Sequence, residues 1–594
     1  MPFKRRSLAI FILVAGRLAM SSETRAATKE DLRISDFYNN SSSLDLPHGS
    51  SKKTDGAGRQ IDNLLDGRTL PIPCASSLLQ ELRRHREALG DSARDALRGL
   101  SQRPSLPRDG NRLTRDGRYR IHFTSEPSSP DAIASSDRDF NGVPDVVDQV
   151  EEALERSETE IILHLGWPSP ASGPQGDRYD VYLVNLGPGR QGLTVPDRDI
   201  PSTPQDDAFS HILLDSRLEG AAVLSAVAHQ VSHASLLGLS TRSPAWWTEA
   251  TAAWLEIQVT GDPAPHREAL AARLERLDAS LSSDSLLLSL GDLLWASYLA
   301  ERREGKGEEV RQIWLELSLR GADRILPILD EVLRRNGQGD LQEAYREFTR
   351  WTLFTGPKND GDHFRLGSLY PPIVPKATHA AFPVESAAGE TVEPLGASLF
   401  RFVGDGTRGG LKIRFEGEAS SPLQVDLVIT PAGASHPHLV ELKLDSRGHG
   451  EIGIPWRGVR EAVMIVRHAA WEGAPARFRY SAQIDPLYPF ELSSFGALPS
   501  PGGITLQWAT ATETDVLGWQ VYRSEYSGGP FTRISPLALP SGADSQEETD
   551  YVYQDASVIS GRRYYYLVEA ITVLGLPERS FVVSARVSDE RTQP

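Results

Sequence analysis

The sequence predicts an α+β core followed by two all-β sandwich domains, and three observations support this. Between residues 116 and 355, strand-like alternation gives way to helical runs with apolar residues at i, i+3 and i+4. From 376 to 486, short alternating runs recur at the regular spacing of β-sandwiches, and residues 487–590 continue with strand-like runs such as W-Q-V-Y-R from Trp519. A Gly/Pro-rich stretch at 356–375 separates the helical part from the first sandwich. A chain of 594 residues is long enough for several such domains.

Composition excludes several classes of partner. The net charge of −17 argues against binding to nucleic acid or to an anionic membrane, because both ligands are themselves negative. After the N-terminus, we expect no span of the membrane, since no stretch is long and apolar enough. Cys74 is the only cysteine, so no intramolecular disulfide can form. The oligomeric state is not predicted by any of these features.

The N-terminus has the pattern of an export signal. Lys4, Arg5 and Arg6 precede the short apolar run 7–16, and we expect a signal peptide over 1–27 and a secreted, periplasmic or cell-surface protein. An uncleaved anchor would need a longer apolar run. Residues 28–115 form a polar extension with one predicted helix, Ser76 to Leu100, which is either a propeptide that packs on the core or a simple extension.

The predicted core, 116–355, begins with strands and ends with helices. We expect three strands over 118–124, 179–185 and 210–214. A helix should follow from 217 to 237, with Ser216 and Glu219 as a capping box and Gly238 as its left-handed stop. The further predicted helices are 245–259, 266–281, 290–302, 308–319, 322–335 and 341–354.

Two histidines on the first of these helices are candidate zinc ligands. His229 and His233 are four residues apart, so they lie on one helical face and both imidazoles can reach a single ion. Glu249, in a W-x-E-x-x-A sequence on the next helix, can supply a carboxylate. Three such ligands with one position left for water are typical of catalytic zinc.

The two helices resemble the H-E-x-x-H and W-x-E-G-x-A segments of gluzincin metallopeptidases. The resemblance implies a zincin-like core with His229, His233 and Glu249 as zinc ligands, and an antiparallel sheet whose edge strand pairs with an extended peptide in the cleft. Gln230 stands where the family has its general-base glutamate, and Ala250 replaces a glycine. Tyr298 is a candidate hydroxyl donor to a tetrahedral intermediate, although its apolar neighbours favour a place in the core.

The glutamine is the serious departure from that pattern. An amide can orient a water molecule but cannot take its proton, and loss of a positioned acid–base group lowers rates roughly 10²- to 10⁴-fold. Glu256 could replace the lost base, but a hydrogen bond to a metal ligand or exposure to solvent is the more ordinary role. Three functions stay open: an impaired or inactive peptidase that binds peptides or protein partners, a weakly active zinc-dependent hydrolase, and a metal-free adhesive or structural protein.

An acidic segment near the start of the core has the spacing of a calcium loop. Oxygen donors occupy positions 1, 3, 5, 9 and 12 of residues 137–148, with Gly142 at position 6. Pro144 at position 8 and an aspartate at position 12 depart from a paired EF-hand; the proline fits the start of a helix over 144–165. The block is similar to one in a group of secreted bacterial metalloprotease-like proteins. The predicted calcium ligands are Asp137, Asp139, Asn141, Asp145 and Asp148.

The last two predicted domains carry no clustered histidines or paired carboxylates. We expect strands of the first sandwich at 398–403, 411–415, 424–429, 462–466 and 478–484. The final segment resembles fibronectin type III modules of secreted bacterial proteins, with Trp508 on an early strand, the run W-Q-V-Y-R from Trp519, and three tyrosines, 564–566, on a late strand. The resemblance implies a spacing, binding or tethering role.

Overall fold

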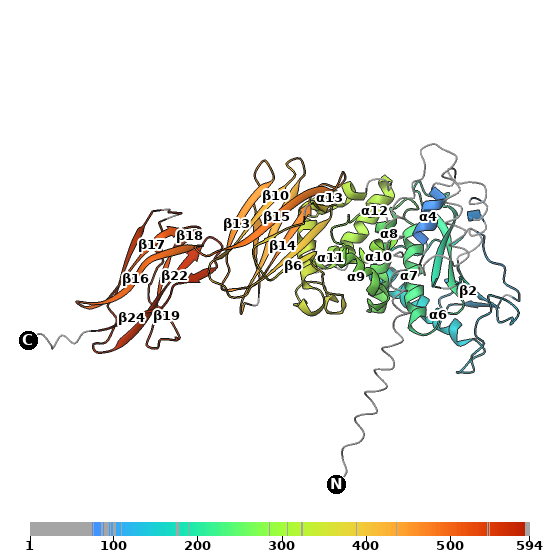
Figure 1. The fold of residues 1–594 in the computed structure, drawn as a ribbon. Helices are drawn as coiled ribbons and strands as arrows, with labels where there is room; N and C mark the ends of the chain where they lie inside the picture. Colours follow the sequence, from blue (N-terminus) through green and yellow to red (C-terminus); the bar gives the residue numbers. More distant parts are fainter. Residues whose placement is uncertain are drawn as a thin grey trace, which may run out of the picture. The chain divides into compact units, whose positions relative to one another are not determined.

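The computed structural model describes Cys74, Ser76–Arg84, Glu87, Arg94 and residues 97–98, and then 102–587 with gaps at 109, 174–177, 188, 284, 304, 306, 322–324, 388, 435, 543 and 546. The predicted signal peptide and most of the predicted N-terminal extension lie outside these residues. The described residues form two compact units, those up to 276 with 281–373 (unit 1) and 277–280 with those from 374 onward (unit 2). The predicted succession of a mixed α/β region followed by β-sheet domains is confirmed (Figure 1).

Unit 1 contains a five-stranded sheet in the order β1-β2-β3-β5-β4. Its strands are β1 (Gly110–Leu113), β2 (Tyr119–Phe123), β3 (Tyr179–Val184), β4 (Gly192–Asp199) and β5 (Ala208–Asp215). The sheet is mixed rather than antiparallel throughout, since β3 runs parallel to both β2 and β5. The reason is a helical crossover between β2 and β3, formed by α6 (Asp145–Ser157) and a π-helical continuation, η2 (Glu158–His164), which returns the chain in the same direction. The last strand in the order, β4, is antiparallel to β5 and lies at the edge.

Two helices follow β5 and carry the candidate zinc ligands. Helix α7 (Ala221–Leu237) packs against β4 and β5, and α8 (Ala245–Thr260) packs against α7. The predicted capping box is wrong: α7 begins after Gly220, whose φ of 59° suits glycine, and no side chain caps it. Instead, Asp215 accepts the backbone N–H of Arg217 in a turn before the helix. Gly238 ends α7 as predicted, but with a right-handed φ of −70°.

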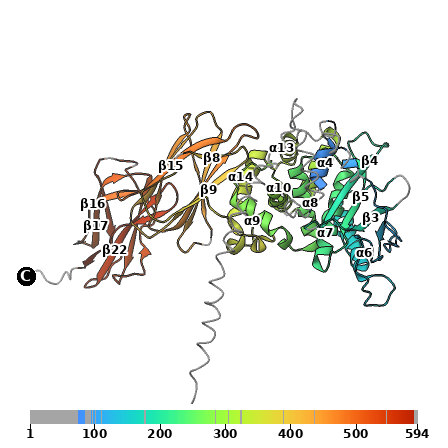
Figure 2. The ribbon, with the colours of Figure 1, turned by 45° about the vertical axis from the view of Figure 1, so that its right-hand side comes forward.

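The rest of unit 1 is helical, as predicted. The helices are α9 (Arg267–Glu275), α10 (Leu286–Gly291), α11 (Leu293–Glu301), α12 (Glu308–Arg320), α13 (Ile325–Arg335) and α14 (Leu341–Trp351), with short 3-10 turns at Ala264–His266, Thr352–Phe354, Gly356–Lys358 and Gly367–Leu369. The single helix predicted over 290–302 is interrupted near Asp292, which is buried and forms an ion pair with Arg273 of α9. Of the predicted N-terminal helix, the structure describes α4 (Ser76–Arg84), which contacts β4 and α8 (Figure 2).

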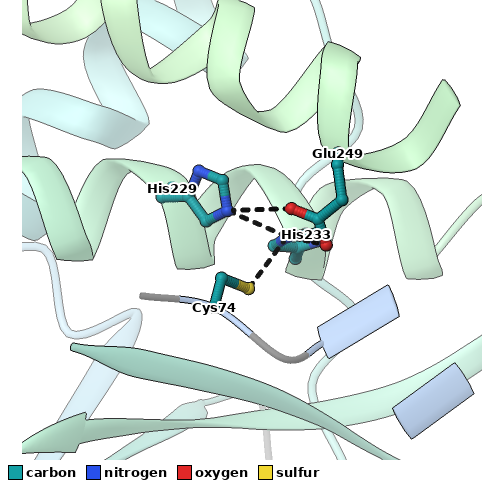
Figure 3. Close-up of side chains that lie close together, drawn as sticks. All are labelled: Cys74, His229, His233 and Glu249. Carbon is teal, nitrogen blue, oxygen red and sulfur yellow. Dashed lines mark hydrogen bonds and ion pairs between the residues drawn. The ribbon is translucent and has the colours of Figure 1, made fainter. Parts of the chain in front are cut away.

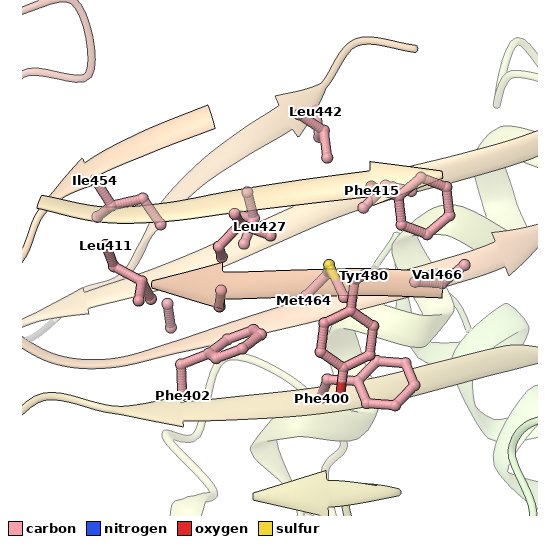
Figure 4. Close-up of a cluster of buried hydrophobic side chains, with 14 of the residues drawn as sticks. Phe400, Phe402, Leu411, Phe415, Leu427, Leu442, Ile454, Met464, Val466 and Tyr480 are labelled. Atoms are coloured by element: carbon pink, nitrogen blue, oxygen red, sulfur yellow. The ribbon is translucent and has the colours of Figure 1, made fainter. Parts of the chain in front are cut away.

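Unit 2 begins with a sandwich of two sheets, β13-β10-β15-β7 with β8 beside β15, and β12-β11-β14-β9-β6. Aromatic and branched aliphatic side chains of the two inner faces interdigitate, among them Phe400, Phe415, Leu427 and Tyr480 (Figure 4). The strands are β6 (Ala377–His379), β7 (Val384–Glu385), β8 (Glu390–Val392), β9 (Ala397–Val403), β10 (Gly410–Gly417), β11 (Leu423–Pro431), β12 (His438–Leu442), β13 (His449–Pro455), β14 (Val459–His468) and β15 (Ala476–Asp485).

A second sandwich completes unit 2, with sheets β16-β17-β21 and β19-β18-β22-β23, and with β20 and β24 beside β18 and β22. Trp508 and Trp519 lie in its core, and the hydroxyl of Tyr564 accepts the backbone N–H of Ile559, as in a tyrosine corner. The strands are β16 (Phe490–Ser500), β17 (Gly503–Glu513), β18 (Val516–Ser524), β19 (Thr532–Arg533), β20 (Leu539–Pro540), β21 (Thr549–Asp555), β22 (Arg563–Thr572), β23 (Pro577–Arg579) and β24 (Val583–Arg586). In the described part of the chain, no helix has the length and apolar character needed to cross a membrane.

Candidate metal centre

The two histidines of α7 point their Nε2 atoms at the same place. His229 and His233 are one helical turn apart, and their Nε2 atoms are 3.1 Å apart. Both side chains are buried, with exposed fractions of 5% and 0%. This is the convergence that the i, i+4 spacing predicts.

Glu249 of α8 completes a group of three. Its Oε2 is 3.5 Å from Nε2 of His229, and its Oε1 is 3.6 Å from Nε2 of His233. The side chain is fully buried, and neither carboxylate oxygen has a hydrogen-bond partner among the described residues. Burial by itself would raise the pKa of Glu249, but the two imidazoles hold that pKa well below its usual value. Buried carboxylate oxygens are ordinarily hydrogen-bonded, so this arrangement fits a bound cation.

A fourth donor, Cys74, joins the group from the N-terminal segment. Its Sγ is 3.3 Å from Nε2 of His233, and the ligand atoms of Cys74, His229, His233 and Glu249 all lie within 4.8 Å of one another. In Figure 3 the thiol and the Glu249 carboxylate approach the histidines from different sides. Burial and Glu249 raise the pKa of the thiol, but the two histidines outweigh them and lower it to about 6. The buried cluster could therefore bind a metal ion.

The sequence alone does not identify Cys74 as a ligand. The thiol lies 159 residues before His233, so no local spacing connects the two. The one available signal was a lone cysteine upstream of a pair of candidate metal-binding histidines.

Gln230 lies beside the cluster, with its side chain fixed by hydroxyl groups. Its Oε1 accepts hydrogen bonds from Oγ1 of Thr194, at 2.8 Å, and from Oγ of Ser76, at 3.1 Å. The side chain also packs closely on Gly192, where an added Cβ would lie 2.6 Å from its Cγ. A carboxylate in the same position could accept both hydroxyls, so the surroundings of Gln230 are compatible with either side chain.

Glu256 contacts the other nitrogen of His229. Its Oε2 is 3.0 Å from Nδ1 of His229 and 2.6 Å from Nε2 of His266, and the hydroxyl of Ser225 donates to its Oε1. Burial would raise the pKa of Glu256, but the two histidines lower it well below its ordinary value. This contact fixes the ring orientation of His229, and the burial of Glu256 favours the hydrogen-bonding alternative over exposure to solvent. His266, which completes this contact, was not anticipated.

The predicted calcium loop is exposed and largely bonded to itself. Asp137 accepts the backbone N–H groups of Asn141 and Gly142, and the Asn141 side chain donates to Asp139 and Asp148. Asp145 is instead held by Ser136 and by the backbone of Arg138. Gly142 has a φ of 85°, as position 6 of such a loop requires. Within the described ranges, the loop's carboxylates do not form a group of metal-ligand atoms as close as the buried cluster does.

Tyr298 lies in the aromatic core of the helical part. Its hydroxyl donates to Glu347, at 2.7 Å, and accepts from Arg302, at 2.9 Å. Its ring packs against Trp295 and Phe348. These contacts favour the structural alternative over a catalytic role.

Comparisons with known proteins give only partial similarities. No protein-family model and no curated protein matches the sequence. A Fn3-like protein from Clostridium thermocellum is 26% identical over 17% of this chain and 93% of that chain, with a TM-score of 0.13. The adhesin domain of Epf from Streptococcus pyogenes is 12% identical over 35% of this chain and 76% of that chain, with a TM-score of 0.15. A beta-1,2-glucanase from Parabacteroides distasonis is 12% identical over 35% and 36%, with a TM-score of 0.12. At these scores the similarities carry no argument about function.

Proposed function

We propose that the core of unit 1 is a zinc-peptidase-like domain in which His229, His233 and Glu249 hold Zn²⁺. The observation that carries this proposal is the Glu249 carboxylate, fully buried and without hydrogen-bond partners in the described part of the chain, beside two converging imidazole nitrogens. Nitrogen and oxygen donors, with a thiol nearby, form a set that suits zinc better than calcium or magnesium.

The proposed domain binds a peptide or protein segment and hydrolyses it poorly or not at all. Bound zinc polarises a carbonyl and lowers the pKa of a water molecule. Catalysis would also need a group that accepts the proton of that water, and the Gln230 amide cannot do so. With Oε1 engaged by Thr194 and Ser76, the amide keeps only Nε2 as a donor to a ligand. An extended segment, whether external or from this chain itself, can pair with the edge strand β4 beside the cluster.

Two further proposals belong to this function. The basic and apolar N-terminus supports export to the periplasm, the cell surface or the medium. The residues 137–148 support a calcium site, because they combine five oxygen-bearing side chains at loop spacing with a left-handed glycine at the sixth position.

Metal content tests the central proposal. The wild-type protein should contain about one zinc per chain, and His233→Ala should contain none. His363→Ala removes a histidine that pairs with Asp360 away from the cluster, and should keep its zinc. A wild-type protein that binds no zinc would overturn the proposal and favour a metal-free adhesive or structural scaffold.

A further inference from the structure

We propose that Cys74 is the fourth ligand of the metal and that Cys74 with helix α4 covers the site beside β4, so that the chain closes its own site. The inference rests on the proposed zinc site and adds to it a protein segment that takes the place of water and of an external ligand. The Sγ of Cys74 belongs to the same group of ligand atoms as His229, His233 and Glu249 (Figure 3).

A second feature of the site, the buried carboxylate of Glu249, also points to a bound metal ion. The Glu249 carboxylate is fully buried, and neither of its oxygens has a hydrogen-bond partner among the described residues. Cys74 itself is 2% exposed, and the backbone N–H of Ser76 donates to its Sγ at 3.4 Å. A thiolate, two imidazoles and a carboxylate are a complete tetrahedral set for zinc.

The backbone next to the thiol takes up part of the edge strand. Cys74 forms a parallel β-bridge with Gly192 of β4. Two residues on, Oγ of Ser76 accepts the backbone N–H of Thr194 at 2.9 Å and donates to Oε1 of Gln230 at 3.1 Å. An extended peptide that adds to an edge strand uses the same backbone groups. The N-terminal segment therefore satisfies the part of β4 that an external peptide would use.

Helix α4 anchors this segment on both walls of the site. Leu79 is buried with Val195 of β4 and Leu213 of β5. Arg83 donates to the backbone carbonyls of Pro196 and Asp197 at the end of β4. Arg84 donates to the carbonyl of Ser243, just before α8, at 3.0 Å. Helix α8 carries Glu249. Helix α4 is therefore bonded both to the edge strand β4 and to the segment just before the helix that holds the third ligand.

The consequence is a closed site. Catalytic zinc sites keep one position open for water or substrate, whereas structural sites have four protein ligands. With Cys74 in the fourth position, neither water nor a small metal-binding molecule has a place. Removal of the thiol should open that position and leave the three other ligands intact.

Cobalt substitution tests the ligand assignment without any assay of activity. Cobalt-loaded wild type should absorb in the near ultraviolet through thiolate-to-cobalt charge transfer. Cys74 is the only cysteine, so that band has one source. Cys74→Ser should lose the band and keep one cobalt per chain with visible d–d absorption. Cobalt bound by the wild type without a thiolate band would overturn the inference and leave the proposed zinc site standing. No cobalt bound by the wild type would overturn both.

Acetohydroxamate tests closure. Added to cobalt-loaded Cys74→Ser, it should change the d–d spectrum as it enters the open position, and it should leave the wild-type spectrum unchanged. Cys74→Ala is a second variant with the same expectation, in case serine itself coordinates. Equal changes in the wild type and the variants would contradict a closed site. Thermal melting of each variant shows that it is folded before its spectrum is compared.

Discussion

The buried cluster and the acidic loop of unit 1 were both predicted from residue spacing, and in the structure they differ in burial and in hydrogen bonding. His229, His233 and Glu249 come from two packed helices, are almost fully buried, and leave carboxylate oxygens without hydrogen-bond partners in the described residues. The carboxylates of 137–148 are partly or fully exposed, and several accept hydrogen bonds from the loop's own backbone or from Asn141.

The difference lies in what each site needs from an ion. A buried carboxylate is costly unless it is paired or coordinated, so the cluster depends on a counter-charge. An exposed loop is solvated and can satisfy its own donors, so an ion adds less to its stability. Residue spacing on a helix therefore determines which side chains converge, because the backbone geometry is regular. The same kind of spacing in a loop permits convergence but does not require it.

The largest effect is expected from restoring a general base at position 230, which tests whether this group is all that the cluster lacks for hydrolysis. Gln230→Glu in the Cys74→Ser background should raise zinc-dependent hydrolysis of a fluorogenic peptide roughly 10²- to 10⁴-fold, because a carboxylate can take the water's proton. Gln230→Ala in the same background is the control and should stay slow. If the glutamate variant is no faster than this control, the missing base is not what limits the site.

Metal removal should destabilise unit 1 strongly. At zinc one thousand times its Kd, bound metal adds about 4 kcal/mol to the free energy of unfolding. Urea unfolding of the wild type with and without a chelator measures this difference. His233→Ala should unfold alike in both conditions, and a chelator effect of equal size in that variant would show that the stabilising metal lies elsewhere.

Glu256 should tune the cluster without being a ligand. Glu256→Gln should weaken zinc binding about 10- to 100-fold, because the neutral amide lacks the negative charge that faces His229 and has only one acceptor oxygen where the carboxylate has two. Competition with a zinc-binding dye measures the affinity. The control, Glu152→Gln, changes an exposed residue of α6 and should leave affinity unchanged. Complete loss of zinc in Glu256→Gln would contradict a purely orienting role.

Calcium should give the smallest effect. At calcium ten times its Kd, occupancy of residues 137–148 would stabilise the fold by about 1.4 kcal/mol, and Asp139→Ala should remove that increment. Thermal melts with calcium and with a chelator measure it, with Asp206→Ala as an exposed aspartate control outside the loop. Identical melting temperatures of the wild type in both conditions would contradict a calcium site at residues 137–148.

The sequence by itself determined the elements that depend on local periodicity. The sequence pattern located α8 to within one residue at each end and located the end of α7, although α7 begins four residues later than predicted. The i, i+4 spacing put His229 and His233 on one face. Alternation located five main strands of the first sandwich, because one side of each strand faces a core. Strand β4 was not predicted, since Pro196 and three charged residues interrupt its alternation of apolar and polar residues.

Only the tertiary structure decided which distant residues meet. It joined Cys74 to His233 across 159 positions, set Glu256 between His229 and His266, and laid Ser76 against Gln230 and β4. It also made the sheet of unit 1 mixed, through the crossover of α6. Local residue spacing cannot predict such contacts, because they depend on how helices, strands and the N-terminal segment pack together after each has formed.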